Sequence, residues 1–368
     1  MERNIIDLPL HYGNAPKYLF ERQKKILFEI GRLIIMEYGT EEFLFRLSDP
    51  IYFQALGCIS GFDWHSSGVT TTVCYALKEV FNNNPEYGLF GFGGKGKNGI
   101  ETPKEIEMNP YVEDKEKFIY ISKLTAKIDN NCIQDGYILY HHTIFVDKKG
   151  NWIVIQQGMN SSNKYARRYH WFNRTTIAEN NKFIIKPHTG IISSTKEKRV
   201  LNLIDEKCEK FQENLIDYLS LSKPDNILKE IKFILEKSNS IFEAGKKFVL
   251  PGHHYVEINF DMKKLHKNLY KLKEKEINSF KDIILTDGIG LKTLRALCLI
   301  SELVYGVSAS INDPAKFSFA FGGKDGHPYP IDKENYDKTI YLLKTIIDKS
   351  KIGDKDKISI FKKLAYMF

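Results

Sequence analysis

The sequence predicts an α+β protein in two parts, a mixed N-terminal domain over residues 1–200 and an all-helical C-terminal domain over residues 201–368. The first part is expected to hold an antiparallel β-hairpin, because the runs 137–146 and 151–156 are rich in β-branched and aromatic residues and flank a Lys-Gly turn. After about residue 200, apolar residues recur at helical spacing among lysines and glutamates. The boundary therefore rests on the change in composition.

The other elements follow from apolar spacing and from residues that start or stop helices. Apolar residues at helical spacing predict a helix over residues 20–38. Ser48-Asp49-Pro50 starts a second helix, and Ser66 or Ser67 is a candidate N-cap for a third helix that ends at Phe81. Short strands are expected at 183–185 and 190–192, and further helices at about 200–220, 224–238 and 262–276.

The composition excludes several classes of protein. Hydrophobic residues make up 42% and charged residues 27% of the 368, which excludes a disordered tail, a collagen-like repeat and a disulfide-rich mini-protein. The five cysteines form no C-x-x-C pair, so neither a disulfide framework nor a cysteine zinc site is expected. A charged N-terminus, without an apolar stretch of about 18 residues, predicts a cytoplasmic protein with no membrane partner. The net charge of +8 is compatible with a polyanionic partner.

The most specific motif lies at residues 283–297 and resembles the helix-hairpin-helix element that holds DNA. The glycines of the Gly288-Ile289-Gly290 turn let the backbone approach a phosphate, and the N–H groups that start the next helix donate to it. Candidate contacts to the DNA backbone are therefore Gly288, Gly290, Lys292 and Thr293. Asp287 stands where the motif usually has proline. The alternative is an ordinary helical corner in which the glycines serve the geometry alone.

The same motif allows a second chemistry. In base-excision glycosylases that carry this hairpin, a lysine follows the turn and a catalytic aspartate lies downstream. Lys292 occupies the first position, and Asp313 or Asp332 could occupy the second. Farther along, the Gly/Pro-rich loop 321–330 either contacts nucleic acid through Lys324 or is a structural connector.

A separate group of residues suggests a metal-dependent hydrolase. Asp63 and His65, two residues apart, can bind one divalent cation or act as a base with its orienting carboxylate. Of the adjacent pair His141 and His142, only one can enter a shared site on a strand, and His142 is the one assigned. Gln157 adds an amide from the partner strand. With Mg²⁺ or Mn²⁺, this group would hydrolyse phosphodiester bonds. In the alternative, Asp63 caps a helix and His65 packs.

Three stretches are candidates for holding phosphate. Cations alternate with aromatic rings over residues 161–200, as in single-strand binders, and the densest part contains Arg167, Arg168, His170 and Trp171. Lys95 lies in the glycine-rich segment 93–99, which lacks the spacing of a nucleotide-binding loop. Residues 66–72 crowd hydroxyl and N–H groups at a helix start, which favours an anion. The alternatives are a solvated basic face and ordinary helix caps.

Several blocks of the sequence resemble an uncharacterised prokaryotic family, mainly archaeal, known as domain of unknown function 763. The blocks extend over nearly the full chain and are Ile6–His11, Phe53–Ser67, Gly93–Gly96, Gln156–Asn160, Arg167–Trp171 and Gly322–Pro328. The resemblance implies a cytoplasmic prokaryotic protein and implies no activity for any single residue.

Together these observations favour a DNA-binding protein of DNA repair or processing. The leading hypothesis is a metal-dependent nuclease that uses Asp63, His65 and His142. The alternatives are a DNA glycosylase that uses Lys292, and a non-enzymatic DNA-binding or repair scaffold.

Overall fold

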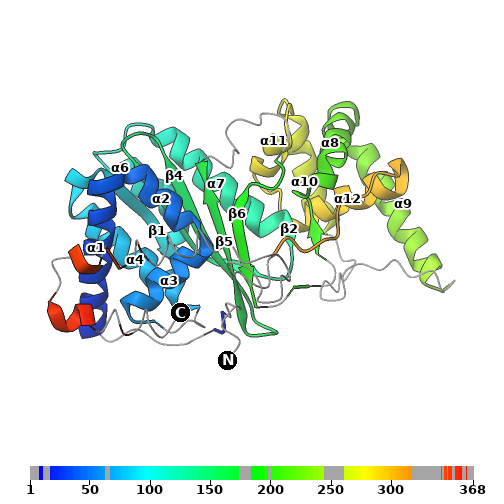
Figure 1. Cartoon of the computed structure of the whole chain (residues 1–368). Coiled ribbons are helices and arrows are strands. Elements are labelled where there is room, and N and C mark those ends of the chain that lie inside the picture. Colours follow the sequence, from blue (N-terminus) through cyan, green and yellow to red (C-terminus); the bar gives the residue numbers. More distant parts are fainter. Residues whose placement is uncertain are drawn as a thin grey trace.

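A five-stranded antiparallel sheet forms the centre of the computed structural model (Figure 1). In spatial order, its strands are β1 (Leu89–Lys95), β3 (Ile138–Asp147), β4 (Trp152–Asn160), β5 (Tyr165–Phe172) and β6 (His188–Ser193). A smaller sheet pairs β2 (Ile133–Gln134) with β7 (Leu201–Asn202). The structure describes residues 8–10, 17–62, 67–173, 184–194, 196–197, 200–243, 261–315, 341, 344–345, 347–349, 353–358 and 362, with the backbone alone for 234–243, 303 and 304. The predicted α+β class with an antiparallel sheet is confirmed.

The predicted hairpin is confirmed as the β3–β4 pair. Val146 pairs with Trp152 at its closed end. The Asp147 carboxylate accepts hydrogen bonds from the backbone N–H groups of Lys149 and Asn151, at 2.9 and 2.8 Å, and Gly150 adopts a φ of 88° that favours glycine. The turn is therefore specified by local residues, which is why the sequence alone predicts it.

The strand expected at 183–185 is absent from its described part, residues 184–185. Instead, the backbone of Ile184 exchanges hydrogen bonds with the side chain of Gln212, at 3.1 and 3.0 Å, which takes the place of a neighbouring strand. The strand expected at 190–192 lies within β6.

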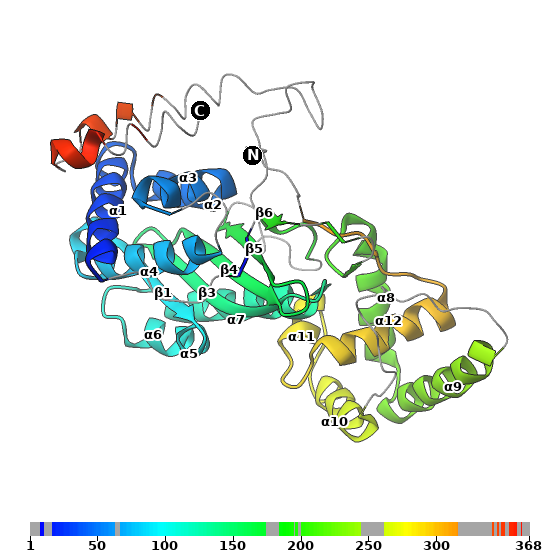
Figure 2. The ribbon, with the colours of Figure 1, turned by 90° about the horizontal axis from the view of Figure 1, so that it is seen from below.

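Four helices cover one face of the sheet (Figure 2). They are α1 (Lys17–Tyr38), α2 (Thr40–Ser48), α3 (Pro50–Ser60) and α4 (Gly68–Asn82). The start of α3 was predicted, and there the Asp49 carboxylate accepts from the N–H groups of Ile51 and Tyr52. The helices bury apolar side chains such as Leu77 against Phe145 and Ile155 of the sheet. This packing places the first turn of α4 over the sheet.

The opposite face packs against α7, and the helices that follow the sheet pack beside α7 (Figure 2). These elements are α7 (Lys115–Asn131), α8 (Glu209–Leu221), α9 (Pro224–Glu243), α10 (Met262–Lys273), α11 (Phe280–Leu285) and α12 (Leu291–Tyr305). The short helices α5 (Lys97–Ile100) and α6 (Thr102–Met108) follow β1, with one-turn 3₁₀ helices at Pro85–Tyr87 and Glu206–Cys208. One hydrophobic cluster includes Trp152 of the sheet together with Ile283 and Leu297 of the helices. Residues on both sides of position 200 therefore share a core.

Two further features concern the whole described structure. All five cysteines are free and buried. Among the described residues, no helix combines the length and apolar character that a membrane crossing requires.

The shared core predicts that a destabilising substitution in the helical part also lowers the stability of the sheet. Ile283→Ala removes a fully buried side chain of α11 and should lower the free energy of unfolding by about 2–5 kcal/mol. Trp152 and Trp171 lie in the sheet, so tryptophan fluorescence during urea unfolding should shift together with helical circular dichroism. Leu221→Ala, at an 85% exposed position, is the control. If Ile283→Ala leaves the urea midpoint of the fluorescence transition unchanged, the shared core is contradicted.

Candidate functional site

The basic and aromatic stretch of β5 lies inside the protein. Arg167, Arg168, His170 and Trp171 are each 0% exposed, because β5 is flanked by β4 and β6 and covered on both faces. Successive residues of a strand point to opposite faces, so Arg167 and Trp171 face α7, while Arg168 and His170 face the side of α3. The expectation that these four side chains line a nucleic-acid surface is therefore not met in this structure.

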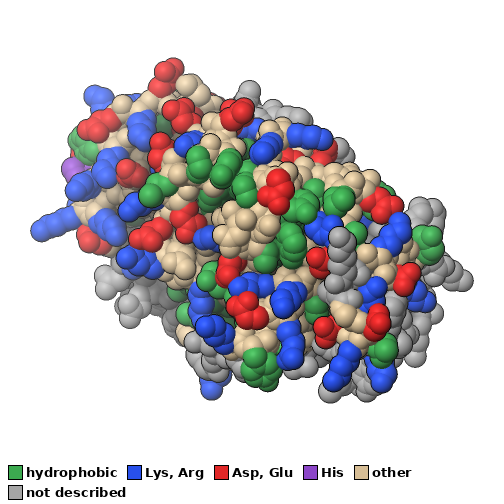
Figure 3. Space-filling view, turned by 90° about the vertical axis from the view of Figure 1, so that its left-hand side faces the viewer, with side chains coloured by type: hydrophobic (Ala, Val, Ile, Leu, Met, Phe, Trp, Pro, Cys, Tyr) green, Lys and Arg blue, Asp and Glu red, His purple; other side chains and the backbone are tan. Residues whose placement is uncertain are grey.

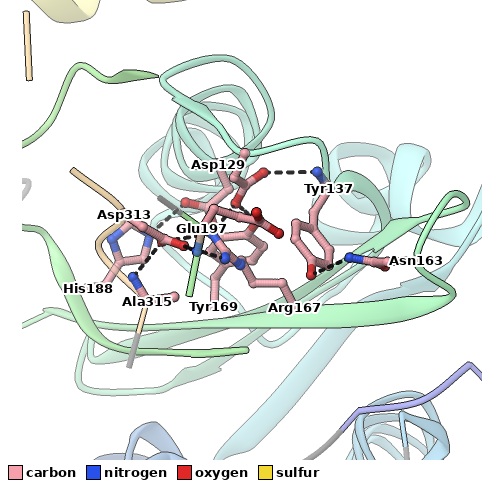
Figure 4. A network of polar contacts seen from close by, with 10 residues as sticks. Asp129, Tyr137, Asn163, Arg167, Tyr169, His188, Glu197, Asp313 and Ala315 are labelled. Carbon is pink, nitrogen blue, oxygen red and sulfur yellow. Dashed lines mark hydrogen bonds and ion pairs between the residues drawn. The ribbon is translucent and has the colours of Figure 1, made fainter. Parts of the chain in front are cut away.

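On the α7 side, Arg167 is held by two buried carboxylates (Figure 4). Its guanidinium donates to Asp135 at 2.7 Å and to both oxygens of Asp313 at 3.0 and 2.8 Å. The hydroxyl of Tyr169 also donates to Asp135, at 3.0 Å. Burial alone would lower the pKa of Arg167, but the two carboxylates outweigh it and raise that pKa. Arg167 is thus a charged structural group whose terminal guanidinium nitrogens are directed at Asp135 and Asp313.

Beside this ion pair lies a histidine–carboxylate pair that the sequence did not single out (Figure 4). The Nε2 atom of His188 is 2.6 Å from the Asp129 carboxylate, and its ring centroid lies 4.1 Å from that of Trp171. Asp129 also accepts from the indole N–H of Trp171 at 2.9 Å and from the Gln156 amide. The side chain of His188 is 6% exposed, and its Nδ1 atom has no hydrogen-bond partner among the described residues.

This pair has the arrangement of a general acid–base unit. A buried carboxylate that holds one imidazole nitrogen selects the tautomer and leaves the other nitrogen for proton transfer. Burial raises the pKa of Asp129, while His188 and the other hydrogen-bond donors act in the opposite direction. Asp129 and His188 are 59 residues apart, and neither belongs to a recognisable motif. The one local signal was a histidine shortly before the apolar pair Ile191 and Ile192.

His142, predicted as a metal ligand, is occupied by protein contacts. Its Nε2 lies 2.8 Å from the Ser122 hydroxyl, and its Nδ1 lies 2.8 Å from the Gln156 amide oxygen. Both ring nitrogens are therefore used, and none is left for a metal. No group of three or more His, Cys, Asp or Glu side chains that could hold a metal was found in the described part of the chain. The other two predicted ligands, Asp63 and His65, lie outside the described residues.

Gln157 lies on the opposite face of the sheet from His142, in a polar row with Arg168. His141, Gln157 and Arg168 pair across β3, β4 and β5, and Lys95 of β1 pairs with His141 at the exposed end. The Gln157 amide donates to the Ser67 carbonyl at 3.0 Å, and it also contacts Tyr140 and the Thr70 hydroxyl. The structure thus brings together Gln157, Arg168 and Lys95 of the predicted site and separates them from His142.

The 283–297 motif forms two helices, α11 and α12, joined by the turn 286–290, in which Asp287 and Gly288 are exposed. Gly288 has a φ of 89°, and a Cβ there would lie 2.4 Å from the side-chain oxygen of Asn268, so only glycine fits. The Asn268 amide nitrogen donates to the Gly288 carbonyl at 2.7 Å and to the hydroxyl of Thr293, which is buried. Gly290 has ordinary extended backbone, and Lys292 is exposed.

Lysines surround this turn. Lys127 of α7 donates to the Thr286 carbonyl at 3.1 Å, and Lys271 of α10 lies 3.4 Å from the Asp287 carbonyl. Burial lowers the pKa of Lys127, an effect that Asp287 opposes and that the nearby Lys275 and Lys123 reinforce. Among the described residues, no side chain caps the N-terminus of α12, so its first N–H groups remain available there. We refer to residues 286–293, which include Lys292, together with Lys127 and Lys271 as the basic turn.

Three predicted site residues remain: one is occupied by hydrogen bonds, and two are not described by the structure. Asp313 accepts from Arg167 and also from the backbone N–H groups of Glu197 and Ala315, at 2.7 and 2.9 Å, so both of its oxygens are occupied. Lys324 and Asp332 lie outside the described residues.

The buried histidines predict a loss of stability in acid. Burial lowers the pKa of His142 to about 4 from 6.5, so between these values the unfolded chain binds a proton that the folded protein resists. Stability should fall by roughly 3 kcal/mol as the pH drops through this window. Burial also lowers the pKa of His141, to about 3, which acts in the same direction.

Chemical denaturation at pH 7, 6, 5 and 4 measures this dependence. His142→Gln should flatten the acid limb, whereas His266→Gln, at a side chain 45% exposed, should leave it steep. Parallel acid limbs for the wild type and His142→Gln would show that His142 does not carry the effect.

Comparisons with known proteins identify the family. No curated protein and no solved structure matches this chain. The model of the family "Protein of unknown function (DUF763)" matches residues 4–331, which include the sheet, the histidine–carboxylate pair and the basic turn. The chain therefore belongs to the DUF763 family.

Proposed function

We propose that this protein binds the backbone of DNA through the basic turn. The observation that carries the proposal is a turn with an exposed glycine at the N-terminus of α12, which no side chain of the described residues caps, next to lysines of α7 and α10. Backbone N–H groups and the helix dipole favour a phosphate at this position, and the lysines add positive charge. Such contacts recognise the backbone and carry no base preference. This interpretation takes the α11–α12 unit as a helix-hairpin-helix in a helical DNA-binding part of the chain.

The face of the molecule that includes α1 offers a weaker alternative surface. There, Lys and Arg side chains are interspersed with Asp and Glu around hydrophobic groups (Figure 3). Mixed charges largely cancel at the distance of a DNA strand, whereas a cluster of one sign attracts a polyanion. Around the basic turn, Asp287 is opposed by Lys123, Lys127 and Lys275. The charge distribution therefore favours the turn.

Binding at the basic turn predicts a defined salt dependence. Lys292→Ala and Lys271→Ala should each weaken binding to duplexes of unrelated sequence equally, because they remove phosphate contacts. Each should also reduce the slope of log K against log salt concentration by about 1. Fluorescence anisotropy at four salt concentrations measures both quantities. Lys149→Ala, at the exposed turn of the β3–β4 hairpin, is the matched control and should change neither. Equal effects of all three substitutions would exclude the turn as the binding surface.

A second proposal concerns cleavage of the bound strand, with His188 and Asp129 as the acid–base pair. The helix α7 connects the two regions, because Lys127 contacts the turn while Asp129, two residues later, holds His188. In phosphodiester hydrolysis, His188 would take a proton from the attacking water as the water oxygen bonds to phosphorus. It would return this proton to the leaving oxygen as the bond from phosphorus to that oxygen breaks. Three alternatives to this chemistry remain. Mg²⁺ or Mn²⁺ held by Asp63 and His65 would activate the water in a metal-dependent nuclease; a DNA glycosylase would use Lys292 with Asp332; and a scaffold would bind without turnover.

End-labelled single-stranded, duplex and lesion-bearing DNA on denaturing gels separates these mechanisms. Breaks by the nuclease should form without alkali, and His188→Gln should slow them by about 10²–10⁴-fold while binding persists. His266→Gln is the matched control. Full cleavage by His188→Gln would remove this residue from the mechanism.

Metal and alkali arms complete the experiment. Loss of cleavage in EDTA, and in Asp63→Ala and His65→Ala, would assign a metal-dependent nuclease. Breaks that need a lesion and alkali, with trapping of Lys292 by borohydride, would assign the glycosylase. Intact DNA in every lane, with binding retained, would leave the scaffold.

A further inference from the structure

Arg167 and Arg168 are adjacent in the sequence but lie in opposite electrostatic environments. Two carboxylates neutralise Arg167 on the α7 side of the sheet. Arg168, on the other side, is 0% exposed and forms no ion pair with any carboxylate of the described residues. Its Nη1 lies 3.3 Å from the Thr70 hydroxyl, its Nη2 lies 3.4 Å from the Pro50 carbonyl, and its Nε has no partner in the part of the chain that the structure describes. A buried guanidinium with two long hydrogen bonds is poorly compensated.

The groups around Arg168 are neutral and do not supply a counter-ion. Burial raises the pKa of Cys74 to about 12, so this neighbouring thiol is uncharged at pH 7. The ring of Phe53 lies 4.8 Å from the guanidinium carbon and provides a cation–π contact without a negative charge. His170 is also fully buried, and its Nε2 has no partner. Burial lowers the pKa of Arg168 to about 9, which reflects the same lack of compensation.

The first turn of α4 adds further positive potential at this position. Thr70, which contacts Arg168, is the third residue of the helix. Ser67 at the N-cap makes no side-chain hydrogen bond to the helix, and the first turn contains no acidic residue. The positive end of a 15-residue helix therefore meets a buried cation, with no anionic side chain of the described residues between them. This is the arrangement that proteins use to bind anions.

We propose that Arg168 and the first turn of α4 bind a phosphate-sized oxyanion inside the protein. Arg168 supplies charged N–H donors, including the unpartnered Nε, and the α4 backbone supplies N–H groups. Hydrogen phosphate also carries an O–H group that can donate to Nε2 of His170. The site lies on the opposite face of the sheet from His188, and it is independent of the basic turn. The ligand is either a free small phosphate or the terminal phosphate of a nucleic acid.

Titration of the full-length protein with inorganic phosphate tests the site. Binding is followed by ³¹P line broadening and by thermal unfolding, with potassium chloride at matched ionic strength as the reference. A saturable response is expected, because a general salt effect continues to rise with concentration. Arg168→Gln should weaken phosphate binding about tenfold or more, since it removes charge-assisted hydrogen bonds. Arg22→Gln, at an exposed residue of α1, changes the net charge equally and should bind as the wild type does.

Two further measurements keep the test decisive if Arg168→Gln fails to fold. Arg168→Lys keeps the charge but loses the planar set of donors, and it should bind phosphate more weakly than the wild type. The wild-type ³¹P titration needs no variant. Its failure to saturate, or equal binding by wild type and a folded Arg168 variant, would overturn the proposal.

A competition experiment then distinguishes the two sources of the oxyanion. A 5′-phosphorylated oligonucleotide that displaces inorganic phosphate, while its 5′-hydroxyl counterpart does not, would assign the terminal phosphate of a nucleic acid. Retention of bound phosphate against both oligonucleotides would assign a free small phosphate. The competition is repeated with Lys292→Ala, which weakens DNA binding at the basic turn. The result for the oxyanion site therefore does not depend on whether the basic turn binds DNA.

Discussion

A buried arginine between two carboxylates connects the sheet to the segments that follow β2 and α12. Arg167 lies on β5, Asp135 follows β2, and Asp313 lies beyond α12, 146 residues away in the chain. The cost of removing these charges from water is large, and it is offset only when every partner is in place. Asp135 and Asp313 also accept backbone N–H groups of Tyr137 and Ala315, so the ion pair orders the neighbouring loops. Loss of one carboxylate would leave a charge uncompensated in the interior.

The helix α7 determines how the candidate sites relate to one another. One side of the helix presents Lys127 to the turn between α11 and α12, and another presents Asp129 to the sheet and to His188. The hydroxyl of Ser122, on the same helix, forms a hydrogen bond with Nε2 of His142. A change in the position of α7 would therefore act on the basic turn and on the histidine–carboxylate pair together. This shared support is the physical reason to consider binding and cleavage as parts of one function.

The two faces of the sheet differ in the groups that surround their buried arginine. The α7 face holds acidic groups that balance Arg167 and hold His188. On the α4 face, Arg168 meets neutral side chains and a helix N-terminus. Polar groups inside proteins are nearly always satisfied, yet on this face Nε of Arg168 and Nε2 of His170 both lack a partner among the described residues.

The sequence by itself determined the features that depend on near neighbours. Asp147 and Gly150 specify the hairpin turn, Asp49 starts α3, and Gly288 supplies the positive φ between α11 and α12, so each could be predicted locally. Only the tertiary structure decided which charged groups are exposed and which of them meet. The dense run at Arg167–Trp171 indicated a basic surface. In the structure, strand alternation points its side chains to the two faces of the sheet, and a layer of helices buries each face. The pair of Asp129 and His188 forms across 59 residues, and no local pattern encodes a contact made by packing a helix on a sheet.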